Sequence, residues 1–202
     1  MSPPHDHAHD HGHDQAHNPA PDHPVADASV RVATPWDVDA VGAVQADVWR
    51  AAYASLLPAE ALAAAAPAEF ARVWRDSLAK PPSGAYRLLV ACAGDEVVGF
   101  AAIGPSADPD ATDVDGELLV GGVSPSARRT GHGSRLLNAA VDTARLTGFA
   151  RVRTWLLGSD APTRGFLEAA GFAADGARRE RVTGPAEGDV TGEVRLIADV
   201  PQ

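Results

Sequence analysis

The stretch Arg128-Arg129-Thr130-Gly131-His132-Gly133 lies between an apolar run, Leu118 to Val123, and a helical pattern from Ser134 to Gly148. Two glycines let the backbone turn tightly and approach a ligand, and the first amides of the following helix lack intrahelical partners. The positive end of the helix dipole faces the same place, and two adjacent arginines add fixed charge. The stretch therefore predicts a phosphate-binding loop at a helix N-terminus.

Two common phosphate-binding motifs do not fit this loop. A nucleoside-triphosphate P-loop requires Gly-Lys-Ser/Thr, and Lys80, the only lysine, lies far from any such run. A dinucleotide fingerprint requires a third glycine where Leu136 stands, and an acidic residue about 20 positions further on. The chain has Arg151-Val152-Arg153 there. A plain strand-to-helix turn with solvated arginines stays open as the simpler interpretation.

The pattern Arg128-x-x-Gly131-x-Gly133 resembles the acyl-CoA pyrophosphate loop of the GNAT acetyltransferase superfamily. The segment from Glu117 to Pro125 is similar to the family's fourth strand, and Gly165 to Phe172 to its second conserved block. Weaker similarity runs from Val30 to Phe100. The resemblance implies an α/β (α+β) fold with a mixed, mostly antiparallel twisted sheet and helices on both faces, in which two central strands splay apart like a V.

The resemblance also implies acetyl-CoA as the cofactor, with its pantetheine arm against the edge of the fourth strand near Gly121 to Ser124. Amides of Gly122 and Val123 are expected to polarise the thioester carbonyl and stabilise the oxyanion. Gly121 and Gly122 suit this role, because glycines in a strand permit a bulge and the close approach of another backbone. The expected cofactor-binding residues are Gly122, Val123, Arg128, Arg129, Thr130, Gly131, His132, Gly133, Ser134, Asp160, Thr163 and Phe166.

Glu117 is the expected catalytic base, because its position matches a glutamate of many family members. It stands six residues before Val123, is expected on the same strand face, and would remove the amine proton directly or through a water. A strand-end carboxylate without chemistry is the alternative. Asp113 and Asp115 could instead attract a cationic acceptor electrostatically.

Two positions depart from the family pattern. Many members carry a tyrosine that protonates the departing CoA sulfur, whereas this chain has Leu167, so a water would have to deliver the proton. Asp160 stands where asparagine is common and is expected either to cap the helix or to contact the cofactor. His132, the only histidine outside the N-terminal tail, is expected to face solvent and to take no part in catalysis.

Trp49 and Tyr53 are the expected acceptor-binding residues, because aromatic walls suit a small amine with an apolar body. Ordinary core packing is an equal alternative. The surrounding pattern loosely resembles family members that acetylate free amino acids, antibiotics or related small amines. The expected reaction is direct transfer to a primary amine in a ternary complex, with a protein N-terminus as the other acceptor considered.

Composition agrees with one folded domain, residues 29–200, behind an extension. The chain has 202 residues, 45% of them hydrophobic, and a net charge of −10. Residues 1–28 hold five aspartates and no Lys or Arg, so the remainder carries −5. An acidic chain argues against nucleic-acid binding. Between Glu117 and Glu180, however, the chain has nine arginines and six acidic residues, so the net charge of this segment is positive where the anionic cofactor is expected.

The chain has one cysteine, Cys92, so an intrachain disulfide is excluded and a reducing cytoplasm is the expected compartment. The sequence contains no run of about 18 apolar residues, and its N-terminus lacks the basic and then apolar segments of a signal peptide. No membrane association is therefore expected. The expected assembly is a monomer or a homodimer.

Residues 1–28 alternate histidine with Asp, Ala, Gly and Pro without apolar periodicity, which predicts a disordered tail. Imidazoles suit Zn, Ni or Cu, so weak metal sites are expected there, at His5, His7, His9, His11 and His13. A solvating tail that binds metal adventitiously is the alternative. The second functional hypothesis is thus a catalytically silent acyl-CoA-binding module with a metal-binding tail.

Apolar spacing and turn residues predict the elements. Strands are expected at residues 29–33, 86–93, 97–103 and 152–157. A further strand carries Glu117, and two more strands complete the chain. Helices are expected after Thr34-Pro35 with Val38, Val41, Val44 and Val48 buried, after Pro58 and Pro67, at 134–147 and at 161–170. A second apolar stripe comprises Phe70, Val73, Trp74 and Leu78.

Overall fold

The computed structural model describes residues 28–57, 59–182 and 190–201, so the histidine-rich tail lies outside the described residues. Seven strands form one sheet: β1 (Ala28–Val32), β2 (Arg87–Ala93), β3 (Glu96–Pro105), β4 (Asp115–Val123), β5 (Arg151–Leu157), β6 (Ala173–Val182) and β7 (Val190–Asp199). Their order is β1-β2-β3-β4-β5-β7-β6, and every neighbouring pair is antiparallel except β4 with β5. The mixed, mostly antiparallel sheet expected from the sequence is confirmed.

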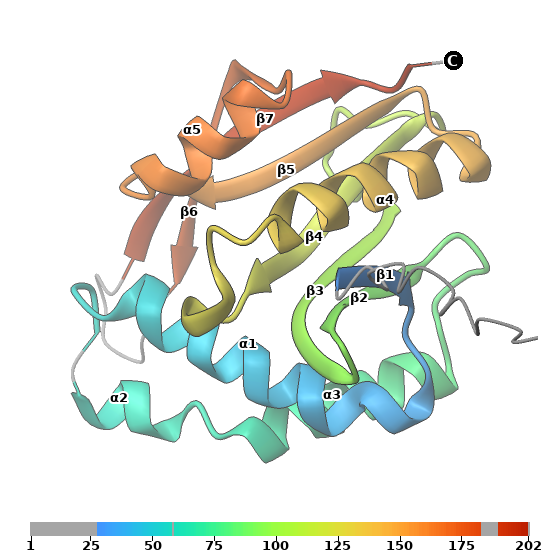
Figure 1. Cartoon of the computed structure of the whole chain (residues 1–202). Helices are drawn as coiled ribbons and strands as arrows, with labels where there is room; N and C mark the ends of the chain where they lie inside the picture. The colour runs from blue at the N-terminus through green and yellow to red at the C-terminus, as the bar shows by residue number, and fades with distance from the viewer. Residues whose placement is uncertain (1–27, 58, 183–189, 202) are drawn as a thin grey trace, which may run out of the picture.

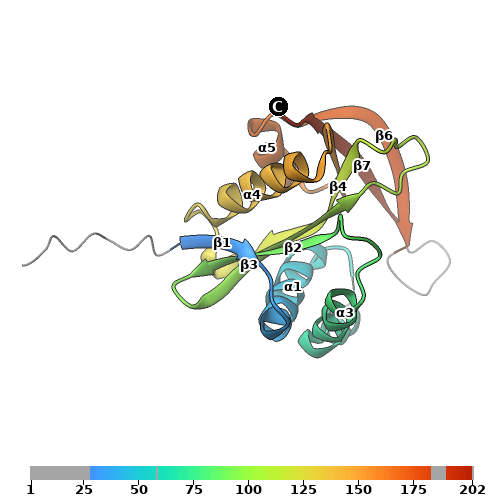
Figure 2. The ribbon, with the colours of Figure 1, turned by 90° about the vertical axis from the view of Figure 1, so that its right-hand side faces the viewer.

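Helices cover both faces of this sheet, as expected (Figures 1 and 2). On one face α1 (Val38–Tyr53) and α3 (Pro67–Ala79) pack against the N-terminal strands, with the short α2 (Ala59–Ala64) between them in the chain. On the other face lie α4 (His132–Thr147) and α5 (Ala161–Ala169). One buried apolar cluster lies under α4 and α5, and a second lies between the sheet and α1 and α3.

The valine spacing of α1 produces its buried face: Val38, Val41 and Val44 are all buried. The stripe predicted for α3 is wrong at Val73, which is exposed, while Ala71 is buried in its place. A Cβ added at Gly42 of α1 would lie only 2.7 Å from the Ala71 backbone nitrogen. The two helices therefore approach at a pair of small residues, and this rotates Val73 toward solvent.

Candidate functional site

Strands β4 and β5 pair at only three positions and then separate. Asp115, Gly116 and Glu117 pair with Arg151, Val152 and Arg153, while β4 continues to Val123 and β5 to Leu157 without further pairing between them. This is the V-shaped opening that the family resemblance implies. Glu117 is the last residue of β4 that pairs with β5, so it lies where the opening begins.

A bulge in β4 changes which residues share a face. The register against β3 shifts between Ala102 and Ile103, which partner Val120 and Leu118. A Cβ added at Gly116 would meet Phe149 under α4, whereas one added at Gly122 would meet Val48 of α1. In an unbroken strand, residues six apart point the same way. The expectation that Glu117 and Val123 share a face is therefore wrong: Glu117 faces the α1 side and Val123 the α4 side.

Only one of the two amides expected to polarise the thioester faces the opening. The Ser124 amide donates to the Val98 carbonyl of β3 at 2.8 Å, and alternate residues of a strand point to the same edge, so Gly122 also faces β3. Val123 faces the opening, and its carbonyl accepts a hydrogen bond from Nε of Arg128 at 3.2 Å. Gly122 is a glycine because Val48 of α1 occupies the space of a side chain.

Residues 128–133, named the glycine loop here, end at the N-terminus of α4. Gly131 caps the helix at φ 89°, and Arg129 has φ 67°, a conformation that favours glycine. The first intrahelical bond runs from the Arg135 amide to the Gly131 carbonyl, which leaves the amides of Gly133 and Ser134 without backbone acceptors among the described residues. Such amides at the positive end of a helix suit a phosphate.

Phe166 and Val123 flank this helix start. An added Cβ at Gly133 would lie 3.7 Å from the Phe166 ring and 3.9 Å from Val123, so α5 and β4 converge beside the glycine loop. Asp160 caps α5 by accepting a hydrogen bond from the Thr163 amide at 3.1 Å, which confirms its capping role. Leu167 is buried in the apolar cluster under α4 and α5.

His132 is not solvent-facing, contrary to expectation. It is 6% exposed, and its Nδ1 is buried without a hydrogen-bond partner. The reason is that α4 begins two residues earlier than predicted, so that His132 joins the buried stripe of Leu136, Ala140 and Ala144 at four-residue spacing.

Glu117 is 8% exposed, and one of its carboxylate oxygens accepts a hydrogen bond from Ser106 Oγ at 3.1 Å. Burial raises the pKa of this carboxyl and nearby Asp108 adds to the rise, although Ser106 and Arg179 oppose it. A carboxyl with a raised pKa is a stronger base than an ordinary glutamate, which suits proton removal from an amine.

Asp115 cannot attract an acceptor, because its carboxylate is buried and paired with Arg151 and Arg153 at 2.7 and 3.1 Å. Burial would raise the pKa of Asp115, but hydrogen bonds from Thr112 and the two guanidinium groups outweigh it and lower the pKa. Asp113 is exposed. Arg153 and Arg195 also bind Asp108 and Asp110, which attaches the loop before β4 to the sheet.

The face of β5, β6 and β7 that continues from Glu117 is polar. We name it the charged face, and it comprises Glu117, Trp155, Arg179, Arg181 and Glu193. Arg179 lies 4.3 Å above the Trp155 ring and donates to Glu193 at 2.6 Å. Sequence reasoning missed these residues except Glu117. The spacing of Arg179 and Arg181 indicates that both lie on one face of a strand, but only the β6–β7 register shows that this face contains Glu193.

Trp49 and Tyr53 lie at the end of α1 next to this face. Their rings are 4.8 Å apart, and Tyr53 is buried. Burial raises the pKa of Tyr53, and charges on Arg181 and Glu193 act on it in opposite directions. The phenol therefore keeps its proton at neutral pH and can donate a hydrogen bond.

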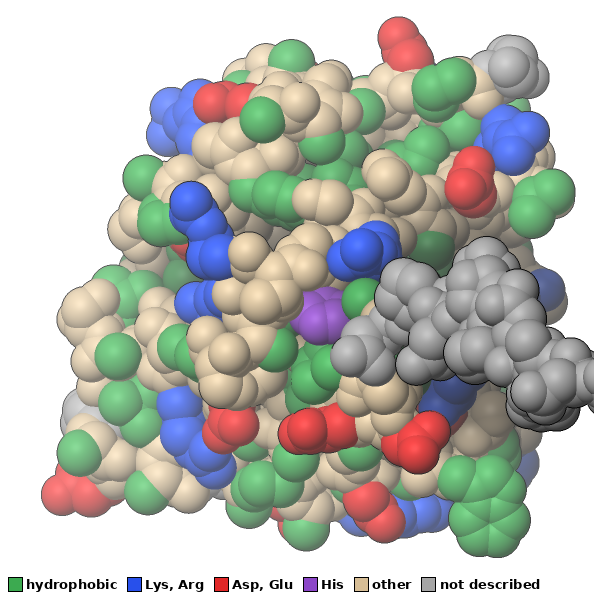
Figure 3. Space-filling model, in the orientation of Figure 1, with side chains coloured by type: hydrophobic (Ala, Val, Ile, Leu, Met, Phe, Trp, Pro, Cys, Tyr) green, Lys and Arg blue, Asp and Glu red, His purple; other side chains and the backbone are tan. Residues whose placement is uncertain are grey.

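The excess of arginine between Glu117 and Glu180 is not gathered at the glycine loop. Arg151, Arg153 and Arg179 pair with carboxylates, as do Arg145 and Arg164 on their own helices. On the face that Figure 3 shows, Lys and Arg side chains are scattered among acidic ones. The local excess of positive charge predicted from the sequence is therefore largely neutralised. Three arginines remain at the glycine loop: Arg128 and Arg129 within it, and Arg135, which donates to the Thr130 carbonyl at 3.4 Å.

Neither a membrane-spanning helix nor a metal-binding cluster of side chains is present in the described part of the chain. No helix among residues 28–57, 59–182 and 190–201 is long and apolar enough to cross a membrane. In the same residues, no group of three or more His, Cys, Asp or Glu side chains is arranged to hold a metal ion.

Comparisons with known proteins agree with this geometry. Among solved structures, a GNAT-family protein from Desulfovibrio desulfuricans is 24% identical, with a TM-score of 0.63 over 86% of this chain and 99% of its own. The PaiA N-acetyltransferase of Thermoplasma acidophilum in complex with coenzyme A is 16% identical, with a TM-score of 0.66 over 85% and 98%. The YncA protein of Salmonella typhimurium with acetyl-CoA is 16% identical, with a TM-score of 0.62 over 87% and 95%.

No curated protein matches the sequence at a significant level. The model of the acetyltransferase (GNAT) family matches residues 43–172, which include most of α1, the opening between β4 and β5, the glycine loop and α5. The chain therefore belongs to the GNAT acetyltransferase family.

Proposed function

We propose that residues 29–200 form an N-acetyltransferase that moves an acetyl group from acetyl-CoA to the primary amine of a small molecule, with both substrates bound at once. One observation carries the proposal. Glu117, with a raised pKa, is the last residue of β4 that pairs with β5, so a base lies where the opening between the strands begins.

The chain's residues fit the cofactor. The amides of Gly133 and Ser134 would hold the diphosphate, with Arg128 and Arg129 beside it, and the free edge of β4 at Val123 would hold the pantetheine arm. Phe166 would contact the arm from α5. When bound, acetyl-CoA supplies an activated acetyl thioester.

The remaining functions belong to side chains and amides of the protein. Glu117 would accept a proton from the amine, and the Val123 amide would stabilise negative charge on the carbonyl oxygen. Leu167 is buried and Tyr53 lies on the acceptor side, so solvent would supply the proton to the leaving thiolate, which is a tolerable leaving group with a thiol pKa of about 8 to 9.

A thiol-release assay with acetyl-CoA and a panel of small amines tests the proposal, and calorimetry with CoA tests binding separately. We expect turnover of at least one amine together with CoA binding. Binding without any turnover would favour the second candidate, a catalytically silent acyl-CoA-binding module, for which the buried Leu167 is the supporting observation. No heat with CoA would exclude both.

A further inference from the structure

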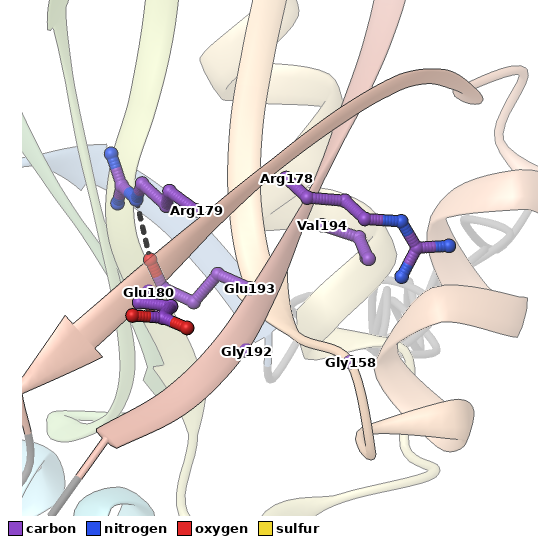
Figure 4. A pocket seen from close by; sticks show the side chains of 7 residues that line it. All are labelled: Gly158, Arg178, Arg179, Glu180, Gly192, Glu193 and Val194. Carbon is purple, nitrogen blue, oxygen red and sulfur yellow. Dashed lines mark hydrogen bonds and ion pairs between the residues drawn. The ribbon is translucent and has the colours of Figure 1, made fainter. Parts of the chain in front are cut away.

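Two arginines and one glutamate form a cluster on the charged face. Glu193 of β7 is buried, at 4% side-chain exposure, and accepts hydrogen bonds from Nε of Arg179 at 2.6 Å and Nη1 of Arg181 at 3.2 Å. Figure 4 shows Arg179 directed to Glu193, while Arg178 points away from both, to the other side of the hairpin. The hollow of about 490 Å³ drawn in Figure 4 is lined by Arg178 and Val194 as well as by Arg179 and Glu193, so it is not confined to the charged face.

The cluster keeps positive charge and unused donors. One carboxylate faces two guanidinium groups, whose side chains are 42% and 54% exposed. Among the described residues, Nη1 and Nη2 of Arg179 and Nε and Nη2 of Arg181 have no hydrogen-bond partner. Arg179 is also held against the Trp155 ring, so its orientation is fixed before any ligand arrives.

These donors lie on the same face of the sheet as the candidate base. Arg179 lies over Trp155, which is two residues along β5 from Arg153, the partner of Glu117, and so shares its face. In agreement with this placement, Arg179 lowers the pKa of Glu117 against the larger effect of burial, and Arg181 acts likewise on Tyr53. Glu117, Tyr53 and the two arginines therefore surround one region, which contains a proton acceptor at one end and anion-binding donors at another.

We propose that Arg179 and Arg181 bind an anionic group of the acceptor, so that the substrate is an amine that carries a carboxylate, with α-amino acids as the simplest class. This inference depends on the proposed function, since it assigns the acceptor of the same site. A guanidinium binds a carboxylate through parallel hydrogen bonds, which fixes orientation as well as charge. A polyamine lacks the anionic group that the free donors of Arg179 and Arg181 would bind.

The test compares α-amino acids with their own carboxamides, which differ only in the anionic group. Each compound is titrated by calorimetry into protein saturated with CoA, and KM is measured in the thiol-release assay. The variants are Arg179→Gln and Arg181→Gln, with Arg178→Gln as the matched control on the opposite side of β6. Arg181→Gln leaves Arg179 paired with Glu193, so it serves if Arg179→Gln fails to fold.

We expect at least one amino acid to bind about tenfold or more tightly than its carboxamide, because hydrogen bonds to charged groups are strong. Arg179→Gln or Arg181→Gln should abolish this preference, and Arg178→Gln should retain it. Equal binding of acids and carboxamides would overturn the anion subsite, even if amines are acetylated. Selective binding without thiol release would support the subsite and overturn acetyl transfer.

Discussion

The glycine loop and the charged face lie on opposite sides of β4 and consist of different chemical groups. The loop offers backbone amides at the start of α4, and its special residues, Arg129 and Gly131, are defined by their φ angles. The charged face offers side chains from β4, β5, β6 and β7, whose positions depend on strand register. A contiguous motif encodes the first region, whereas tertiary structure assembles the second.

This contrast predicts where each kind of substitution acts. Changes in backbone conformation at the loop should affect cofactor binding, because the contacts proposed there are made by amides. Changes of single charges on the charged face and in the ion pairs next to it should affect proton transfer, acceptor choice or the stability of the loop before β4. Substitutions at Glu117, Arg153, Gly131 and Asp160 test this division.

Glu117→Gln should lower kcat/KM by about 10²- to 10⁴-fold, since general-base catalysis contributes that much. CoA affinity, measured by calorimetry, should stay unchanged. In the wild type, activity should rise with pH through the pKa of Glu117, because only the ionised form accepts a proton, and this rise should lie above the range of an ordinary glutamate. The variant should lose that limb of the profile.

Two further variants check the assignment to Glu117. Ser106→Ala removes a hydrogen bond that lowers the pKa of Glu117, so the rising limb should move to higher pH. Asp113→Asn, an exposed carboxyl nearby, should leave the profile as it is. An unaltered rate in Glu117→Gln would remove this residue from the mechanism.

Arg153→Met should destabilise the fold by about 3 kcal/mol, because it leaves buried carboxylates with fewer partners. Arg153 pairs with the buried carboxylates of Asp115 at 3.1 Å and Asp108 at 3.7 Å, and with the exposed Asp110 at 2.8 Å. Chemical denaturation measures the loss. The matched control is Arg72→Met, which removes exposed ion pairs of α3 and should change stability by about 0.5 kcal/mol or less. Equal effects in the two variants would contradict a structural role for the buried network.

Gly131→Ala should cost about 1–2 kcal/mol of stability, because the residue has φ 89°. Gly148→Ala is the control: it has φ 93° at the other end of α4 and should cost a similar amount. Only Gly131→Ala should also weaken CoA binding in calorimetry, since it distorts the glycine loop. Parallel losses of CoA affinity in both variants would show that the loop has no special part in binding.

Asp160→Ala should cost about 1 kcal/mol, the usual contribution of a helix cap. Asp160→Asn should be nearly neutral, because asparagine also caps the Thr163 amide. Thermal denaturation distinguishes the two. CoA affinity should hardly change in either variant; a large loss in Asp160→Asn would indicate that the carboxylate contacts the cofactor.

Much of the fold was predictable because local patterns encode it. Valine spacing predicted the buried face of α1, Gly148 the end of α4, and the order of strands and helices agreed with the structure. The errors have tertiary causes. Val73 is exposed because α1 and α3 meet at small residues. His132 is buried because α4 begins two residues earlier than predicted, which places His132 on the face of the helix that packs against the core.

The candidate site divides in the same way. Local sequence was enough to specify the glycine loop, the capping of α5 by Asp160 and the position of Glu117 near the start of a central strand, because each depends on neighbours within a few residues. The bulge that turns Glu117 and Val123 to opposite faces, by contrast, is present only in the folded sheet. The same is true of the cluster of Arg179, Arg181 and Glu193 near Glu117. Strand register sets those contacts, and register arises from the packing of the whole sheet, which no single segment specifies.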